Sequence, residues 1–266
     1  MRIRITTARL PPGNAGDDRV FTTEHAVVVL DGSSAFIPLD VPASTYADRL
    51  GGHLRDTLAT RPDADLRATL ADGIAATAAE LGLVPGESPS STVTILRALD
   101  ERVDVLMLGD NLLVWPGESL TDDRMDRLRV EPWLRYRERL AAGTGYDTEH
   151  RRLLRELHRE LTRLRNRDGG YWIAEADPAA AAHALGWSRD AGAVPWAVLA
   201  TDGAYRTMRH LGLDDWPELA GADSAALAGV LDRCQRWEAD TDPDGAALPR
   251  AKRHDDKTLA VVRRTR

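Results

Sequence analysis

The sequence has few thiols, few lysines and no long apolar run. Its single cysteine, Cys234, excludes an internal disulfide and a multi-cysteine zinc site. Lysine occurs only at Lys252 and Lys257, so arginine supplies almost all of the positive charge. No apolar run approaches the ~20 residues that a membrane-spanning helix needs, and the N-terminal residues are too polar for a signal peptide. We therefore expect a cytoplasmic protein without a membrane partner.

The charge balance and the missing motifs exclude further classes. Acidic residues outnumber basic ones, 42 to 35, which gives a formal net charge of −7 and argues against a nucleic-acid partner. The sequence has no P-loop, no dinucleotide-binding glycine motif and no His-Glu-x-x-His pair. A chain of 266 residues, 43% of them hydrophobic, is long enough to bury a substantial core.

What the sequence does contain is a set of aspartates beside short apolar runs. A single aspartate at the end of a strand is common, because aspartate is favoured in turns. Four of them, spread along the chain, predict that several strand ends converge on one acidic site. Burying unpaired carboxylates together is costly, and a divalent cation such as Mg²⁺ or Mn²⁺, which prefers oxygen ligands, removes that cost. The four aspartates are Asp31, Asp110, Asp202 and Asp255, beside the runs 26–30, 103–108, 194–200 and 258–262.

Periodic patterns predict an α+β fold. Apolar residues at helical spacing predict helices over 42–60, 65–81, 124–142 and 149–165, and further helical segments after residue 203. Short β-like runs with short connections are typical of antiparallel sheets. The predicted strands cover residues 2–7, 24–30, 91–99, 103–108, 112–115, 169–174 and 258–263, and no internal repeat or linker divides the chain.

Two further features can be interpreted either as structural or as functional. Residues 149–167 carry seven arginines beside an apolar stripe, which is typical of a solvated amphipathic helix; a positive face for a phosphorylated or acidic partner is the alternative. His254 adjoins two aspartates and is a candidate proton donor. The serines before residue 92 lack a Gly-x-Ser-x-Gly elbow, so we interpret them as small residues that allow tight packing beneath the site.

The ordered set of motifs resembles the metal-dependent protein phosphatases of type 2C, in the style of their small bacterial members. That family carries Asn-Glu-Asp, Asp-Gly-x-Gly, Gly-Ser-Thr, Gly-Asp-Ser, Ser-Asp-Gly and Asp-Asn-x-Thr in this order. The counterparts here span the chain in the same order: Gly16-Asp17-Asp18, Asp31-Gly32-Ser33-Ser34, Ser90-Ser91-Thr92, Gly109-Asp110-Asn111, Thr201-Asp202-Gly203 and Asp255-Asp256-Lys257-Thr258.

The resemblance implies a two-layer antiparallel β-sandwich flanked by α-helices, with two divalent cations, Mn²⁺ or Mg²⁺, at one end. Asp31 is expected to bridge both cations. The other implied ligands are the Gly32 carbonyl, Asp202, Asp255, one of Asp17 and Asp18, and, for a weaker third cation, Asp110.

The sequence also departs from the family pattern. Ser34 replaces the second glycine of Asp-Gly-x-Gly, and Asp256 replaces the asparagine of the last motif. The phosphate-binding arginine of the family falls on Gly13, so we expect either that Arg9 or Arg19 binds the substrate instead or that the affinity for phosphate is low. Residues 122–193 do not match the usual flap of the family.

The predicted architecture is therefore one phosphatase-like domain over residues 1–266, with a variable helical insert at about 122–193. The predicted activity is hydrolysis of phosphate monoesters by a metal-activated water, with His254 as a general acid and a phosphoserine or phosphothreonine protein as the substrate. Two alternatives stay open: a small-molecule phosphatase in a biosynthetic pathway, and a phosphatase-like regulatory module with weak turnover or none.

Overall fold

The computed structural model describes residues 2–13 and 15–265. These residues form two five-stranded sheets in which all neighbouring strands are antiparallel. The first sheet has the order β1 (Arg2–Leu10), β10 (Lys257–Thr265), β9 (Trp196–Ala200), β6 (Leu112–Trp115) and β7 (Glu118–Thr121). The second has the order β2 (Arg19–Thr22), β3 (Ala26–Leu30), β4 (Val93–Ala98), β5 (Arg102–Leu108) and β8 (Leu185–Asp190).

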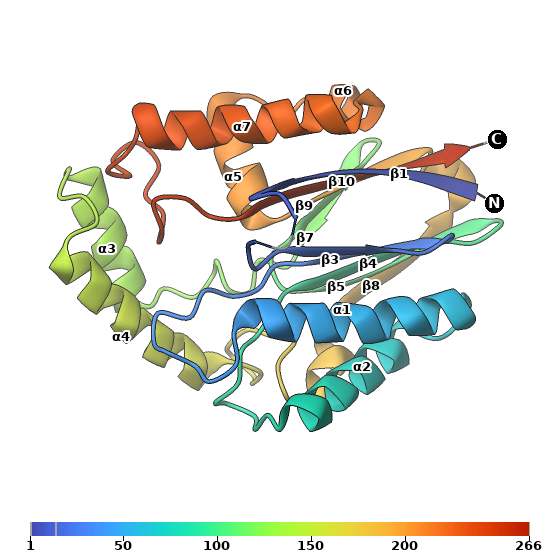
Figure 1. The fold of residues 1–266 in the computed structure, drawn as a ribbon, viewed down its shortest axis with the longest axis horizontal. Coiled ribbons are helices and arrows are strands. Elements are labelled where there is room, and N and C mark those ends of the chain that lie inside the picture. The colour runs from blue at the N-terminus through green and yellow to red at the C-terminus, as the bar shows by residue number, and fades with distance from the viewer. Residues whose placement is uncertain (1, 14, 266) are drawn as a thin grey trace.

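Helices cover the outer faces of both sheets (Figure 1). The second sheet is covered by α1 (Ala43–Thr60) and α2 (Leu66–Leu81), and the first by α5 (Asp202–Leu211), α6 (Trp216–Gly221) and α7 (Ser224–Asp240). The helices α3 (Glu131–Ala141) and α4 (Thr148–Leu164) lie beyond one end of the sandwich (Figure 1). Two short 3₁₀ helices, η1 (Pro178–His183) and η2 (Ala191–Ala193), flank β8.

The central strands are buried on both faces, which explains their unbroken apolar runs. In β3, Val27 and Val29 belong to the core between the two sheets, whereas Val28 and Leu30 pack toward α1 and α2. Because successive strand side chains point to opposite faces, a strand covered on both sides needs no polar alternation. The predicted two-layer antiparallel sandwich flanked by helices is therefore confirmed. In the described ranges, no helix combines the length and apolarity needed to cross a membrane.

The element predictions hold best for the helices that pack on a sheet or on each other. The helices predicted over 42–60, 65–81 and 149–165 match α1, α2 and α4 closely.

The helix predicted over 124–142 is wrong in its first part, because α3 begins only at Glu131 and the preceding residues form turns. Residues 169–174 make only isolated bridges in place of the predicted strand. The strands β7 and β8 are not predicted by the sequence pattern. Residues 185–190, inside the expected insert, pair with β5 and so form an edge of the second sheet.

Candidate active site

Four of the aspartates from the strand ends line one cavity. Asp31 follows β3, Asp110 lies between β5 and β6, Asp202 begins α5 directly after β9, and Asp255 precedes β10. Because β9 pairs with both β10 and β6, the ends of these three strands are neighbours. All four aspartates line a cavity of about 650 Å³. In the described part of the chain, no three acidic, histidine or cysteine side chains already form a compact ligand set for a metal ion.

Asp18 lies buried between the two sheets and has one unpartnered oxygen. Its Oδ2 accepts hydrogen bonds from Thr201 Oγ1 at 2.9 Å and Thr258 Oγ1 at 2.7 Å. Its buried Oδ1 has no hydrogen-bond partner among the described residues. Burial, with smaller effects from the nearby Asp256 and Asp255, raises the pKa of Asp18 to about 7, although the two threonine hydrogen bonds lower it. A carboxylate held in this way lacks a positive partner.

Burial is the largest cause of the raised pKa values at this site, and repulsion between neighbouring carboxylates adds to it. Burial raises the pKa of Asp31 well above its ordinary range, and the charges of Asp18, Asp202, Asp255 and Asp110 raise it further. Burial and, to a smaller extent, the negative charge of Asp202 raise the pKa of Asp110 to about 7. Carboxylates that repel one another take up protons or bind cations, so the site favours a positively charged ligand.

Two basic side chains that the sequence analysis did not single out partly neutralise this charge. The Nζ atom of Lys252 lies 2.5 Å from Asp255 Oδ1. The guanidinium of Arg206 lies 3.1 Å from Asp110 Oδ2 and 3.4 Å from Asp202 Oδ2. Spacing gave a weak signal for both, because Lys252 precedes Asp255 by three residues and Arg206 follows Asp202 by four along a predicted helix.

Two motif glycines allow the strand ends to approach one another. A Cβ atom on Gly203 would lie 2.1 Å from the backbone oxygen of Asp256, and one on Gly32 would lie 2.9 Å from the Cβ atom of Asp17. Real Cβ atoms do not make contacts this short, so each position requires glycine for the chains to pack. The Asp-Gly pairs therefore place an acidic side chain at a point where two segments touch.

The remaining acidic residues and His254 lie around this core of the site. The backbone N–H of Asp17 donates a short hydrogen bond to Asp256 Oδ2, so Asp256 fastens the loop before β2. His254 turns toward α7, where its Nδ1 lies 3.1 Å from Oε2 of the buried Glu238. The role of His254 as a general acid stays a prediction.

The two arginines expected to bind substrate both contact the backbone beside Asp18. Arg9 Nη1 lies 3.4 Å from the Asp18 carbonyl oxygen. Arg19 is buried, donates to the same carbonyl at 2.8 Å, and pairs with Asp48 at 2.6 Å. Both side chains therefore support the loop that carries Asp18, and their substrate-binding role stays a prediction. The cavity is instead lined by Arg137, Arg165, Arg206, Arg209 and Arg250.

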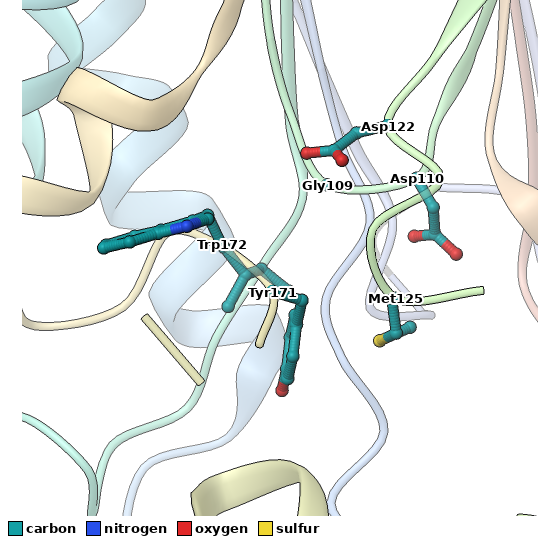
Figure 2. Close-up of a pocket in the computed structure, with 7 residues that line it drawn as sticks. Gly109, Asp110, Asp122, Met125, Tyr171 and Trp172 are labelled. Carbon is teal, nitrogen blue, oxygen red and sulfur yellow. The ribbon is translucent and has the colours of Figure 1, made fainter. Parts of the chain in front are cut away.

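A small side pocket adjoins the cavity at Asp110. Figure 2 shows Asp110 and Asp122 on neighbouring segments, with Met125 and Tyr171 nearby. Asp122 is buried and pairs with Arg124, which also donates to the His183 carbonyl at 2.9 Å. This contact fixes the start of the segment 122–130 against the chain that leads into β8.

Comparison with known proteins finds relatives by structure alone. No protein-family model and no curated protein matches the chain. Its fold is similar to that of the photosystem II phosphatase PBCP (12% identity, 99% of both chains covered, TM-score 0.59). It is also similar to the serine/threonine phosphatase Stp1 from Staphylococcus aureus (12%, 100% of this chain and 96% of that one, TM-score 0.56). A third match is the catalytic domain of the serine/threonine phosphatase PstP in complex with two manganese ions (16%, 98% of both chains, TM-score 0.50). Over its whole length, the chain therefore has the fold of the type 2C phosphatases.

Proposed function

We propose that the protein is a phosphatase that uses divalent cations to hydrolyse phosphate monoesters, with phosphoserine and phosphothreonine residues of proteins as its substrates and the cytoplasm as its location. The observation that carries the proposal is the meeting of four strand-end aspartates in one cavity. The shared fold of PBCP, Stp1 and PstP supports it, because the PstP structure contains two manganese ions.

The chemistry of the donor groups fits hard divalent cations. Carboxylate oxygens are the ligands that Mn²⁺ and Mg²⁺ prefer, and the unpartnered Oδ1 of Asp18 marks a place where positive charge is missing. In this proposal two cations are held by Asp31, the Gly32 carbonyl, Asp202, Asp255 and one of Asp17 and Asp18, with Asp110 available for a third. When bound, such cations neutralise phosphoryl oxygens and lower the pKa of a bound water.

The chain itself positions and neutralises this ligand set. Thr201 and Thr258 hold Asp18 in one orientation, so its free oxygen stays available. Lys252 and Arg206 compensate the carboxylates until cations bind. The Lys252–Asp255 pair is partly exposed, and such pairs contribute about 1 kcal/mol or less, so a cation can displace it.

Hydrolysis of p-nitrophenyl phosphate and of a phosphothreonine peptide, measured over a range of Mn²⁺ concentrations, tests the proposal. We expect turnover that requires Mn²⁺ and falls at least 100-fold in Asp202→Asn, an order of magnitude typical for lost electrostatic stabilisation. Asp232→Asn, on the exposed side of α7, is the matched control and should retain activity.

The same assay separates the alternative functions. Turnover of phosphorylated metabolites in preference to phosphopeptides would favour a small-molecule phosphatase. No turnover at any Mn²⁺ concentration would contradict catalysis and favour a regulatory module.

A further inference from the structure

The cavity is much larger than a phosphoryl group needs. Only one part of its lining is acidic; the opposite part comes from α3, α4 and the loop after β3. A volume of about 650 Å³ is in the range of pockets that enclose whole ligands of a few hundred daltons, roughly 300–1,000 Å³. The part of the cavity beyond the aspartates therefore has room for a second group of the substrate.

The far wall is apolar and partly open. Phe36, Trp133 and Leu161 line the cavity, and each keeps part of its surface accessible, while Leu157 beneath them is buried. Exposed apolar surface is unfavourable in water in proportion to its area. An apolar group that enters this part of the cavity would remove that surface from water, whereas a small polar group would gain little there.

The wall is fixed with respect to the acidic site. Tyr136, Leu140 and Leu153 belong to one buried cluster that packs α3 against α4. His150 of α4 lies 2.9 Å, through its Nε2, from the carbonyl oxygen of Ala251. The hydroxyl of Tyr146 donates to the Lys252 carbonyl at 3.3 Å. Both contacts reach the loop that leads into Asp255, so the apolar wall and the aspartates form one preorganised surface.

The charge at the rim favours an anionic peptide over a neutral ligand. The exposed guanidinium of Arg137 lies 5.8 Å from the ring centroid of Trp133. In the ranges that the structure describes, Arg137 makes no ion pair, whereas Arg135 and Arg139 of the same helix pair with acidic residues. A substrate that places an apolar group against Trp133 would bring its backbone or a flanking acidic group beside this unpaired cation.

We propose that Phe36, Trp133 and Leu161 form a specificity pocket for a bulky apolar side chain that neighbours the phosphorylated residue of a protein substrate. The inference rests on the proposed phosphatase function and adds a substrate class to it. Trp133 is a specificity-determining residue in this account, because it provides the largest aromatic surface of the pocket.

The test compares two phosphothreonine peptides that differ only in the residues flanking the phosphothreonine, leucine in one and glycine in the other. We expect kcat/KM of the wild-type protein to be about tenfold or more higher for the leucine peptide, the discrimination that a hydrophobic pocket provides. Trp133→Ala should remove most of this preference by lowering kcat/KM for the leucine peptide much more than for the glycine peptide. Leu134→Ala is the matched control, because Leu134 is the next residue of α3 and is 40% exposed to solvent.

Phe36→Ser provides a second variant, at a residue in the loop after β3 that packs against the α3–α4 cluster. Thermal melting checks that each variant is folded. Equal kcat/KM for the two peptides in the wild-type protein would overturn the specificity pocket and leave the proposed function standing. A preference that survives in folded Trp133→Ala and Phe36→Ser would also overturn it. No turnover of either peptide, or of p-nitrophenyl phosphate, would instead refute the phosphatase function, and the pocket with it.

Discussion

A buried ion pair directly behind the acidic site gives the sharpest stability prediction. Lys257, the first residue of β10, is fully buried, and its Nζ lies 2.9 Å from Oε2 of Glu238 on α7. The same Nζ donates to the Asp255 carbonyl at 2.9 Å. The other carboxylate oxygen of Glu238 accepts from Thr207 Oγ1 at 2.8 Å. Replacing Lys257 alone therefore removes the lysine charge from this buried carboxylate and leaves the Thr207 hydroxyl and the half-buried His254 ring beside it.

The expected cost follows from this burial. Removing one partner of a buried pair destabilises a protein by about 3–5 kcal/mol, because the remaining charge is uncompensated. For a chain of this size each kcal/mol lowers the melting temperature by about 2–4 °C, so Lys257→Met should melt about 10 °C lower than the wild-type protein.

A double-mutant cycle isolates the charge pair. Glu238→Gln removes the negative charge and keeps an oxygen for the Thr207 hydroxyl. Lys257→Met combined with Glu238→Gln should recover at least about 2 kcal/mol relative to the sum of the two single changes, as expected for residues in direct contact. Urea unfolding at one pH gives the four free energies of unfolding.

Additive effects would refute this reasoning, because they would show that the two charges do not stabilise each other. A Lys257→Met variant within 1 kcal/mol of the wild-type protein would refute it as well. Either outcome would mean that Glu238 finds another partner or reaches water in solution.

Three further predictions concern the acidic site itself. Lys252→Met should bind Mn²⁺ about fivefold more tightly by calorimetry, because an ion pair of about 1 kcal/mol no longer competes for Asp255. In EDTA, the free energy of unfolding should fall as the pH rises from about 4 to about 7. The reason is that burial raises the pKa of Asp18 to about 7, so over this pH range the unfolded chain has released a proton that the folded chain still holds. Asp18→Asn should reduce the slope, and Asp31 and Asp110, whose pKa values are also raised, should retain the rest of it. Gly203→Ala should destabilise the protein, because its Cβ would lie 2.1 Å from the Asp256 backbone oxygen.

Each of these three predictions, for Lys252, Asp18 and Gly203, has its own control or contradicting outcome. Lys252→Arg keeps a cation and should leave the affinity for Mn²⁺ close to that of the wild-type protein; an equal gain in both variants would contradict competition. A pH profile that keeps its slope in Asp18→Asn would assign the pH dependence to other carboxyl groups. Gly229→Ala, in α7 with open space around its added Cβ, should leave stability unchanged or raise it slightly, and an equal loss at both glycines would contradict the close-approach argument.

The sequence predicted the positions of the strand-end aspartates because two local signals coincide there. An unbroken apolar run indicates a strand buried on both faces, and the aspartate after it marks the point where the chain turns. The edge strand β8 gave a weaker signal, because its polar and exposed residues outnumber its inward-facing ones, Leu185 and Trp187. The residues before α3 have a helical sequence pattern but form turns, and in these turns Asp122 pairs with Arg124 two residues later.

The contacts that complete the site left at most a weak local pattern, because they also depend on tertiary structure. Lys252 lies three residues before Asp255, but the loop that carries both residues is held against α4 through His150. The apolar wall likewise depends on how α3 packs on α4. The arginine-rich face of α4 is largely that of a solvated amphipathic helix, because Arg152 and Arg163 pair with glutamates of the same helix.

The binding of divalent cations by the strand-end aspartates is the central claim, and calorimetric titration with Mn²⁺ tests it most directly. The account predicts that the wild-type protein and Asp232→Asn bind two Mn²⁺ ions, and that Asp31→Asn and Asp202→Asn lose at least one of them without unfolding. Mn²⁺ binding that is the same in the wild-type protein, Asp31→Asn and Asp202→Asn would contradict the claim.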